Sequence, residues 1–330
     1  MTAQDIDQLF ASFAGTRVLV IGDIMIDAYL WGKVDRISPE APVPVISITK
    51  KEYRLGGAAN VALNLKALGA EPIICASYGT DESAKVLAGL MNEHQLSCEG
   101  LIATADKPTT VKTRVISAGQ HMLRIDEELD TDLDAAAEQE VLRRIDKILD
   151  SGSIDVLIFE DYNKGLLTET LIGAIIERAR EKGIPTAVDP KKKNFLSYRN
   201  VDLFKPNLKE LREGLKVEID RANVDQVRAA VEKLSGELDQ RIAFITLSEY
   251  GVFLKSNEFD GIIPAHKREI ADVSGAGDTV ISVAALCLAK KVPHHMLAAL
   301  SNLAGGLVCE EVGVVPITKE KLHREALKLV

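Results

Sequence analysis

Short apolar runs that alternate with helix-length segments are the feature that most constrains the fold of this chain. The first run, 17–21, ends at Gly22 and Asp23, and a helical pattern covers 57–69. Further strand-like runs follow at 71–76, 154–160, 185–188, 201–204 and 242–247. Further helices are predicted at 167–182, from Asn207 onward, and at 222–235, 275–290, 293–310 and 317–328. Runs of this kind are typical of parallel strands buried on both faces, so we predict an α/β fold with a mostly parallel central sheet flanked by helices.

Two segments interrupt this alternation. Residues 31–48 are rich in proline and β-branched side chains and show no helical period, and residues 109–126 are typical of a hairpin that turns near Gly119. We expect the two segments to form a small β lid subdomain inserted in the α/β body. The chain shows no internal repeat and no linker, so a single domain over 1–330 is expected.

The composition excludes several classes of function. The chain has 330 residues, of which 46% are hydrophobic, and its formal net charge of −9 argues against a general nucleic-acid binder. The four cysteines are widely spaced and the six histidines form no H-E-x-x-H motif, so neither a disulfide framework nor a zinc site is expected. No basic leader precedes an apolar segment, and no apolar run reaches membrane-spanning length. We therefore expect a cytoplasmic protein without nucleic-acid or membrane partners.

The segment 272–279 is predicted to bind an anion. Gly275, Ala276 and Gly277 precede Asp278, and an apolar run of helical length follows. Free backbone N–H groups at a helix N-terminus attract phosphate, and glycine lets the phosphate come close. Asp278 would then accept a proton from an attacking hydroxyl, although a helix N-terminus would lower its pKa. Taken alone, a glycine-rich turn with Asp278 at a helix start explains the pattern at least as well.

Two polar side chains follow predicted strands, at the edge where open α/β sheets bind ligands. Asp27 comes shortly after Gly22 and is an acceptor suited to sugar hydroxyls. Asn60 follows a run of small residues and offers a donor and an acceptor together. A loop carboxylate and a plain helix start explain these two positions equally well.

Two later segments have the same kind of position. Asn207 and Glu210 are three residues apart on a predicted first helical turn, so they could hold a hydrated Mg²⁺ together. The bare pattern also fits a capping box, in which the two residues only start the helix. Residues 246–251 end a predicted strand with hydroxyl groups, and they could contact a nucleotide or simply form a hairpin.

In this combination and order, the motifs resemble the ribokinase/PfkB carbohydrate kinase family along nearly the whole chain. The matches are G-D-x-x-x-D at 22–27, G-G-A-A-N at 56–60, N-x-x-E at 207–210, the strand end at 246–251 and G-A-G-D at 275–278. The resemblance implies a ribokinase-like fold in which a β lid covers the sugar and often forms a homodimer. It also implies ATP and Mg²⁺ as cofactors, and it raises the question of a monovalent cation.

The resemblance also implies roles for individual residues. Asp278 would be the catalytic base, and the anion hole would be formed by Gly275, Ala276 and Gly277. Mg²⁺ would be organised, through water, by Asn207 and Glu210. The sugar would be contacted by Asp27, Gly57 and Asn60. The nucleotide would lie beside Thr246, Ser248, Gly251 and Asn302.

A narrower resemblance is to the bacterial D-glycero-β-D-manno-heptose-7-phosphate kinases, the kinase domain of bifunctional ADP-heptose synthesis proteins. It covers about the whole chain and is carried by the segments 36–45, 112–114, 123–126, 161–165 and 189–191. It implies phosphorylation of the heptose 7-phosphate at C1 in ADP-heptose biosynthesis, which supplies lipopolysaccharide or S-layer glycans. The sequence shows no second nucleotide motif, so we expect the kinase activity without an adenylyltransferase domain.

A substrate that already carries a phosphate needs cationic side chains around it, and arginine matches phosphate geometry well. The sugar end is predicted to include Arg36, Lys112, Arg114, Asp126, Lys164 and Lys191. The sequence leaves open which of them meets the 7-phosphate. Two alternatives also stay open: a kinase for another phosphorylated sugar or a nucleoside, and a non-catalytic sugar-binding regulator. The intact glycine loop and Asp278 argue against the regulator.

Overall fold

The computed structural model describes residues 1–220 and 223–330 of the chain. Its main sheet consists of β1 (Arg17–Gly22), β4 (Glu71–Tyr78), β5 (Leu101–Ala103), β8 (Val156–Glu160), β9 (Thr186–Asp189), β10 (Leu203–Phe204), β11 (Ile242–Thr246), β12 (Val252–Lys255) and β13 (Asp260–Ile263). The nine strands lie in the order β13-β12-β11-β10-β9-β8-β1-β4-β5. Every neighbouring pair from β5 to β11 is parallel, and only β12 and β13 are antiparallel. The predicted mostly parallel sheet is therefore confirmed.

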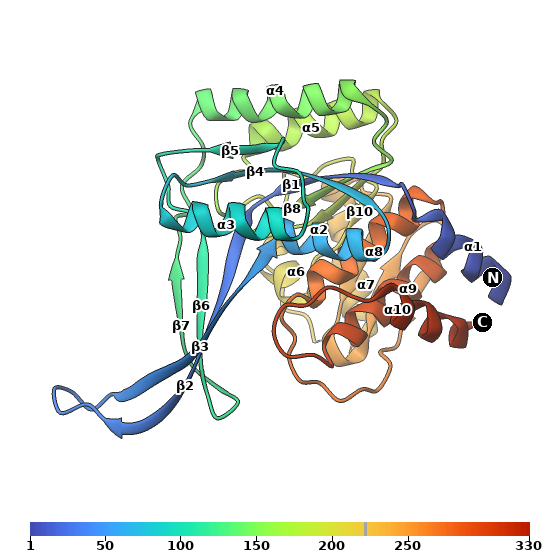
Figure 1. Cartoon of the computed structure of the whole chain (residues 1–330). Helices are drawn as coiled ribbons and strands as arrows, with labels where there is room; N and C mark the ends of the chain where they lie inside the picture. Colours follow the sequence, from blue (N-terminus) through green and yellow to red (C-terminus); the bar gives the residue numbers. More distant parts are fainter. Residues whose placement is uncertain (221–222) are drawn as a thin grey trace.

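Helices cover both faces of this sheet (Figure 1). One face carries α1 (Ala3–Ser12), α2 (Ala58–Ala67), α3 (Glu82–Glu93), α8 (Ala276–Ala289), α9 (His294–Val308) and α10 (Lys319–Ala326). The other face carries α4 (Ala135–Ser151), α5 (Glu169–Glu181), α6 (Leu208–Leu215) and α7 (Val224–Leu238). The two short 3₁₀ turns are Ser248–Tyr250 and Leu327–Leu329. Ala222, the first residue of the helix predicted at 222–235, lies outside the described residues.

Alternation along the central strands sends side chains into two separate cores. Val18 and Val20 pack with α2, α8 and α9, whereas Leu19 and Ile21 pack with the helices of the opposite face. All four side chains have no exposed surface. Because both faces of these strands are buried, their sequences are continuous runs of apolar residues. No described helix combines the length and apolar character needed to cross a membrane.

A second, four-stranded sheet projects from the body and forms the lid (Figure 1). It contains β2 (Ile24–Ile37), β3 (Pro44–Gly57), β6 (Val111–Ser117) and β7 (Gln120–Glu127), in the order β3-β2-β6-β7. The β2–β3 and β6–β7 pairs are antiparallel, and β2–β6 is parallel. The strands β2 and β3 extend beyond both ends of the segment predicted at 31–48, since β2 begins at Ile24 and β3 ends at Gly57. Asp27 therefore lies inside a strand and is not a loop carboxylate.

The strand order reverses direction at β1, which marks the ligand-binding edge of the body. The chain passes from β1 to β4 on one side and later returns to place β8 on the other side. Ligands bind at the carboxyl ends of strands at such a switch point. Gly22 ends β1 there, and a Cβ atom at this position would lie 2.0 Å from the carbonyl oxygen of Glu160. Only glycine fits this close approach of the two strand ends.

Candidate active site

The N-terminus of α8 lies at this edge and presents free backbone donors. Gly275 is the N-cap residue with φ 78°, a left-handed conformation that glycine adopts without strain. Ala276, Gly277 and Asp278 form the first helical turn. Among the described residues, no acceptor receives a hydrogen bond from the N–H of Gly277 or Asp278. Free donors at the positive end of the helix dipole suit the binding of an anion, so the anion site at this helix N-terminus stays a prediction that the geometry allows.

Asp278 is held by donors from two other elements. Asn60 of α2 donates from Nδ2 to Oδ2 of Asp278 at 2.6 Å, and the Tyr162 hydroxyl donates to Oδ1 at 2.8 Å. The carboxylate is buried, and burial raises its pKa above the ordinary value even though both hydrogen bonds act to lower it. The expectation of a pKa lowered by the helix N-terminus is therefore wrong, because burial outweighs the polar contacts. A raised pKa makes Asp278 a better proton acceptor.

Tyr162 is a site residue that the sequence analysis missed. Its backbone N–H donates to Oδ2 of Asp23 at 2.8 Å, which fixes the loop that follows β8. Burial and the charge of Asp278 raise the pKa of Tyr162 well above the ordinary value, so its hydroxyl stays protonated and donates. Tyr162 directly follows Glu160 and Asp161 at the end of β8. Because the strand ends at this edge face the ligand, this position could have identified it from the sequence.

A second set of charges lies on β9, β10 and α6. Asp189 ends β9, and its carboxylate forms an ion pair with Lys205 at 2.9 Å. Lys191 contacts Glu210 at 2.7 Å and Asp189 at 3.6 Å. Burial acts to raise the pKa of Asp189, but Lys191 and Lys205 outweigh it and lower the pKa. Lys191 was predicted at the sugar end with the lid residues, whereas the structure pairs it with Glu210 of α6.

Asn207 and Glu210 form the capping box that the sequence left open as one alternative. Oδ1 of Asn207 accepts from the Glu210 N–H at 2.9 Å, and Oε2 of Glu210 accepts from the Asn207 N–H at 2.8 Å. Glu210 is buried, and its second carboxylate oxygen, Oε1, forms an ion pair with Lys191. Carboxylate and amide oxygens keep further lone pairs, so a capping role and water-mediated metal binding are compatible.

The lid turns a charged face toward the site. Arg54, Asp27, Lys112 and Asp126 lie side by side across the four strands, and Arg114 forms a short ion pair with Asp27. Arg54 of this face donates to the Val314 carbonyl at 3.0 Å, and a Cβ atom at Gly275 would lie 3.3 Å from the Val314 side chain, so this face lies near the N-terminus of α8. Gly57 ends β3 next to Asp23, where a Cβ atom would be 2.3 Å from the Asp23 carbonyl oxygen.

The basic side chains of the lid are not equivalent. Lys112 and Lys164 share one carboxylate, Glu128, at 2.6 and 2.7 Å, and all three side chains are largely buried. Lys112 also lies 3.5 Å from Asp126. Arg36 is exposed and lies one residue before the end of β2, so the structure does not bring it to the other predicted sugar residues. Figure 1 shows the far end of β2 on the arm that projects from the body.

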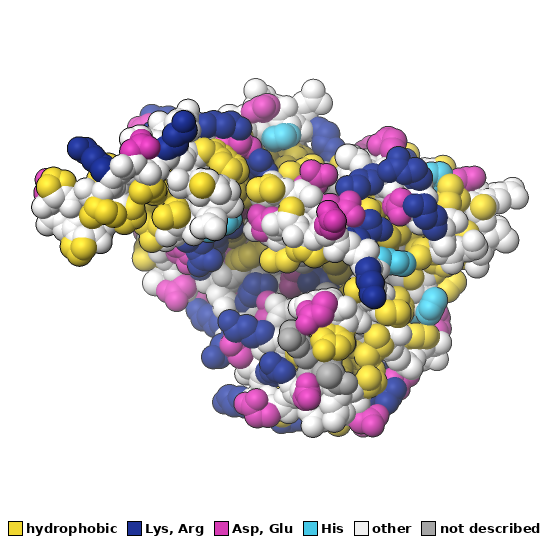
Figure 2. All heavy atoms as spheres, turned by 90° about the horizontal axis from the view of Figure 1, so that it is seen from below, with side chains coloured by type: hydrophobic (Ala, Val, Ile, Leu, Met, Phe, Trp, Pro, Cys, Tyr) yellow, Lys and Arg dark blue, Asp and Glu magenta, His cyan; other side chains and the backbone are white. Residues whose placement is uncertain are grey.

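A cavity of about 880 Å³ opens beside the anion site. Its lining includes four of the six residues predicted at the nucleotide, Thr246, Ser248, Gly251 and Asn302, but not Asn207 and Glu210. Ala276 and Gly277 also line it, so the cavity ends at the α8 N-terminus. The segment 265–268 lines it as well and was not predicted. Figure 2 shows this face of the molecule hollowed near its centre, with Lys and Arg side chains around the hollow.

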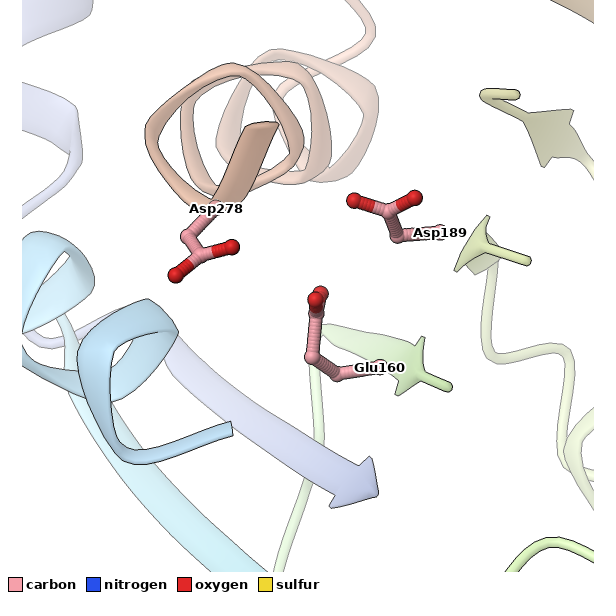
Figure 3. Close-up of side chains that lie close together, drawn as sticks. All are labelled: Glu160, Asp189 and Asp278. Carbon is pink, nitrogen blue, oxygen red and sulfur yellow. The ribbon is translucent and has the colours of Figure 1, made fainter. Parts of the chain in front are cut away.

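Glu160 is a second residue that the sequence analysis missed. It ends β8, has no exposed surface, and neither of its carboxylate oxygens has a hydrogen-bond partner among the described residues. Its carboxylate converges with those of Asp189 and Asp278, as Figure 3 shows. Burial, followed by these two charges, raises the pKa of Glu160 well above the ordinary value.

Comparison with known families identifies the fold's relatives. A model described as "pfkB family carbohydrate kinase" matches residues 15–321. The chain belongs to the pfkB family of carbohydrate kinases. Membership makes it a phosphotransferase and implies the use of ATP. The bifunctional protein HldE of Syntrophotalea carbinolica is 37% identical over 98% of this chain, and that of Methylobacillus flagellatus is 39% identical over 93%. The chain spans 65% and 62% of the lengths of these two relatives.

Solved structures of low sequence identity share the fold. Phosphofructokinase-2 from Escherichia coli in complex with potassium aligns with a TM-score of 0.78 at 17% identity, covering 96% of this chain and 99% of that chain. Ribokinase from Arabidopsis thaliana complexed with ribose and ATP aligns with a TM-score of 0.70 at 17% identity, covering 95% and 99%. These likenesses establish the ribokinase-like arrangement of a parallel sheet and a small lid.

Proposed function

We propose that this pfkB-family kinase transfers the γ-phosphoryl group of ATP to the C1 hydroxyl of D-glycero-β-D-manno-heptose 7-phosphate. The sugar oxygen forms the new P–O bond, the bond to ADP breaks, and the hydroxyl proton passes to Asp278. The observation that carries the proposal is the position of Asp278, buried at the α8 N-terminus and oriented by Asn60 and Tyr162. The HldE relatives support heptose 7-phosphate as the acceptor and ADP-heptose biosynthesis as the pathway.

The nucleotide would occupy the cavity beside α8, with its terminal phosphate at the free N–H groups of Gly277 and Asp278. Mg²⁺ bound with ATP neutralises charge on the phosphates as the phosphoryl group moves. Asn207 and Glu210 fit this ion, because their oxygens retain acceptor capacity for metal-bound water. A monovalent-cation requirement stays a prediction. Because ATP is the proposed donor, we place the reaction in the cytoplasm.

The sugar would lie between the lid and α8, in contact with Asp27 and Asn60. A candidate anion site lies where the lid meets the body: the ammonium groups of Lys112 in β6 and of Lys164 in the loop after β8 both contact the carboxylate of Glu128. Asp126 lies near Lys112 but is also paired with Arg124, so three cationic groups face two carboxylates and one positive charge is in excess. The excess positive charge and the partial burial favour a phosphate over a neutral hydroxyl. We propose that this cluster, Lys112–Glu128–Lys164, receives the 7-phosphate. Arg114 would instead orient Asp27 toward the sugar.

The outer face of the lid supports the homodimer. Tyr53 and Ile125 lie in one row across the sheet, and Leu123 lies in the next row, all on the face opposite the charged row. Their exposed fractions are 42, 45 and 58%. An exposed apolar sheet face is typical of a protein interface, and a second copy of this lid would cover it. Sedimentation equilibrium should give a dimer for the native chain and a monomer for Leu123→Glu. A monomeric native chain would contradict this.

A coupled assay of ADP release tests the substrate directly. The purified chain is supplied with ATP and, in turn, heptose 7-phosphate, unphosphorylated heptose, fructose 6-phosphate, ribose and a nucleoside. We expect the highest kcat/KM for heptose 7-phosphate. A higher value for another sugar or for the nucleoside would replace the proposed acceptor, and release with none of them would favour the sugar-binding regulator.

A further inference from the structure

Tyr29 joins the lid to the body at a point that no step of the proposed reaction uses. It lies in β2 on the same face as Asp27, because side chains two residues apart in a strand point to the same side. Only 1% of its surface is exposed. Its hydroxyl oxygen accepts a hydrogen bond from the Val314 N–H at 3.0 Å, and Val314 lies in the loop between α9 and α10. A buried side chain of the lid therefore holds the backbone of a body loop.

Arg54 holds the same loop from the neighbouring strand β3. It donates from Nη1 to the carbonyl oxygens of Val314 at 3.0 Å and of Val312 at 3.2 Å. Its guanidinium carbon lies 4.9 Å from the centroid of the Tyr29 ring. A Cβ atom at Gly313 would lie 2.8 Å from Nη1 of Arg54 and 3.0 Å from the Tyr29 hydroxyl oxygen. The backbone of the loop therefore packs directly on the two lid side chains.

The loop in turn contacts the N-terminus of α8. A Cβ atom at Gly275, the N-cap residue, would lie 3.3 Å from Cγ1 of Val314. The Gly313 N–H donates to Oδ2 of Asp272 at 2.9 Å, and Oδ1 of Asp272 accepts from the Ser274 N–H at 3.0 Å. Two contacts thus connect the loop with the segment that enters α8. The position of the loop therefore influences where the first helical turn presents its free N–H groups.

On its other side, Tyr29 contacts the residues that would hold the sugar. Arg114 is its register partner in β6, and the guanidinium carbon of Arg114 lies 5.5 Å from the centroid of the Tyr29 ring. Arg114 also forms the short ion pair with Asp27. A cation over an aromatic ring is attracted by it, so Tyr29, Arg114 and Asp27 form one connected unit. This unit extends from the proposed sugar ligand to the loop that contacts Gly275.

We propose that Tyr29 is a positioning residue for the phosphoryl transfer: its hydroxyl holds Val314 against Gly275 and thereby orients the α8 N-terminus toward the γ-phosphoryl group. This inference rests on the proposed function and adds to it a coupling between the two substrates. A sugar bound at Asp27 fixes the unit, so ATP should bind more tightly once the sugar is present, and the sugar once ATP is present. Tyr29 takes no part in bond making, because burial raises the pKa of its hydroxyl and the proton stays in place.

Tyr29→Phe tests the inference, because it keeps the ring that both guanidinium groups contact and removes only the acceptor of the Val314 N–H. A small misplacement of the reacting groups slows the chemical step, so we expect kcat to fall by about 10–100-fold. The Kd of heptose 7-phosphate without nucleotide should stay close to the native value, because Asp27 and Arg114 are unchanged. In calorimetric titrations, heptose 7-phosphate should tighten the binding of a non-hydrolysable ATP analogue by at least about fivefold in the native chain and hardly at all in Tyr29→Phe.

Tyr198→Phe is the matched control, because it also removes a buried tyrosine hydroxyl from a hydrogen bond, here to Asp161 at 2.7 Å. It should lose stability and keep the native kcat and the native coupling between sugar and nucleotide. Arg54→Met removes the second contact with the loop and should lower kcat in the same way. Arg54→Lys retains a donor and should recover part of the loss. If Tyr29→Phe does not fold, the two Arg54 variants decide.

Native kcat and native coupling in both Tyr29→Phe and Arg54→Met would overturn the inference. An equal fall of kcat in Tyr198→Phe would also overturn it, because lost stability alone would then explain the effect. So would weaker binding of the sugar alone with an unchanged kcat. A native chain that phosphorylates no sugar would refute the proposed function and this inference with it. An active native chain whose sugar and nucleotide bind independently would refute this inference alone.

Discussion

The two sides of the site around Asp278 are built differently. On the body side, Asn60 and Tyr162 hold the carboxylate of Asp278, in the first turn of α8, through short hydrogen bonds in a buried setting. On the lid side, the charged residues are engaged in ion pairs with one another, as in Lys112 and Lys164 with Glu128. The body therefore presents its geometry before a substrate arrives, whereas the lid must exchange ion-pair partners to receive a phosphate. This difference separates the parts that set the rate from the parts that select the sugar.

The body side should give the largest effect on turnover. Asp278→Asn removes the proton acceptor while it keeps the shape of the side chain, so kcat should fall by about 10²–10⁴-fold. Nucleotide affinity, measured by fluorescence or calorimetric titration, should change little. Asp161→Asn is the matched control, because Asp161 is another buried carboxylate; it lies directly after β8 and accepts hydrogen bonds from Tyr198 and from the Asn163 N–H. A kcat within a few-fold of the native value for Asp278→Asn would remove Asp278 from the base role.

The metal-organising pair should show the next largest effect. Glu210→Gln lowers the charge beside the nucleotide phosphates but keeps an acceptor for the Asn207 N–H. We expect turnover to fall and the Mg²⁺ concentration at half-maximal rate to rise, each by about 10–100-fold. The measurement is a Mg²⁺ titration of the initial rate at fixed ATP. If only the Tm changes, Glu210 acts solely as a helix cap.

The lid side should change discrimination and leave kcat nearly intact. Lys164→Ala removes one of the two ammonium groups at Glu128. The kcat/KM for heptose 7-phosphate should fall by about tenfold, a loss typical of one charged hydrogen bond, while that for unphosphorylated heptose should not fall. Lys193→Ala is the control, since Lys193 forms an ion pair with Asp132 outside the cluster. Equal losses on both sugars would place Lys164 in the general packing of the lid.

The smallest effect should be a displaced pH profile. The Tyr162 hydroxyl donates to the ionised form of Asp278 and so lowers its pKa; Tyr162→Phe removes this effect and should raise the pKa. The acid limb of kcat/KM should therefore move to higher pH, by about one to two units, because a hydrogen bond to a charged group contributes about 1.5–3 kcal/mol and burial is unchanged. At pH values above the acid limb, the kcat/KM values of Tyr162→Phe and of the native chain should converge.

Tyr198→Phe supplies the comparison for that profile. The Tyr198 hydroxyl donates to Asp161 at 2.7 Å, a bond of the same kind made to a different carboxylate. This variant should lose stability and keep the native acid limb. An acid limb that moves equally in both variants, or that moves to lower pH in Tyr162→Phe, would show that Asp278 does not control it.

The sequence predicted best those parts in which local patterns decide the structure. The glycine-rich segment before Asp278 and the capping pair Asn207–Glu210 each depend on neighbours within a few residues, and both fold as expected. The convergence of Glu160 with Asp189 depends on strand register, which joins residues 29 positions apart and has no local signature. The role of Lys191 at the sugar end stays a prediction. The sequence did not indicate its ion pairs with Glu210 and Asp189, because charge alone does not show which of several carboxylates a flexible side chain will meet.

The lid was predicted as a β subdomain, but its extent was not. Gly22 and Asp23 look like the end of a strand, yet the chain continues after them into β2, which places Asp27 within the lid sheet. The backbone changes direction at Asp23, but the residues before and after it both lie in strands. Arg36 was predicted at the sugar end because of its charge. In the structure β2 continues to Ile37, so Arg36 lies far along this strand from Asp27.

The central claim is that Asp278 lets this chain phosphorylate C1 of a heptose 7-phosphate. ³¹P NMR of the native chain with ATP, Mg²⁺ and heptose 7-phosphate tests it most directly, run beside Asp278→Asn under the same conditions. The account predicts a new resonance of an anomeric phosphate, coupled to the C1 proton and formed together with ADP, in the native sample, and almost none with Asp278→Asn. A product phosphorylated at another carbon, or equal formation of the C1 phosphate by both proteins, would contradict it.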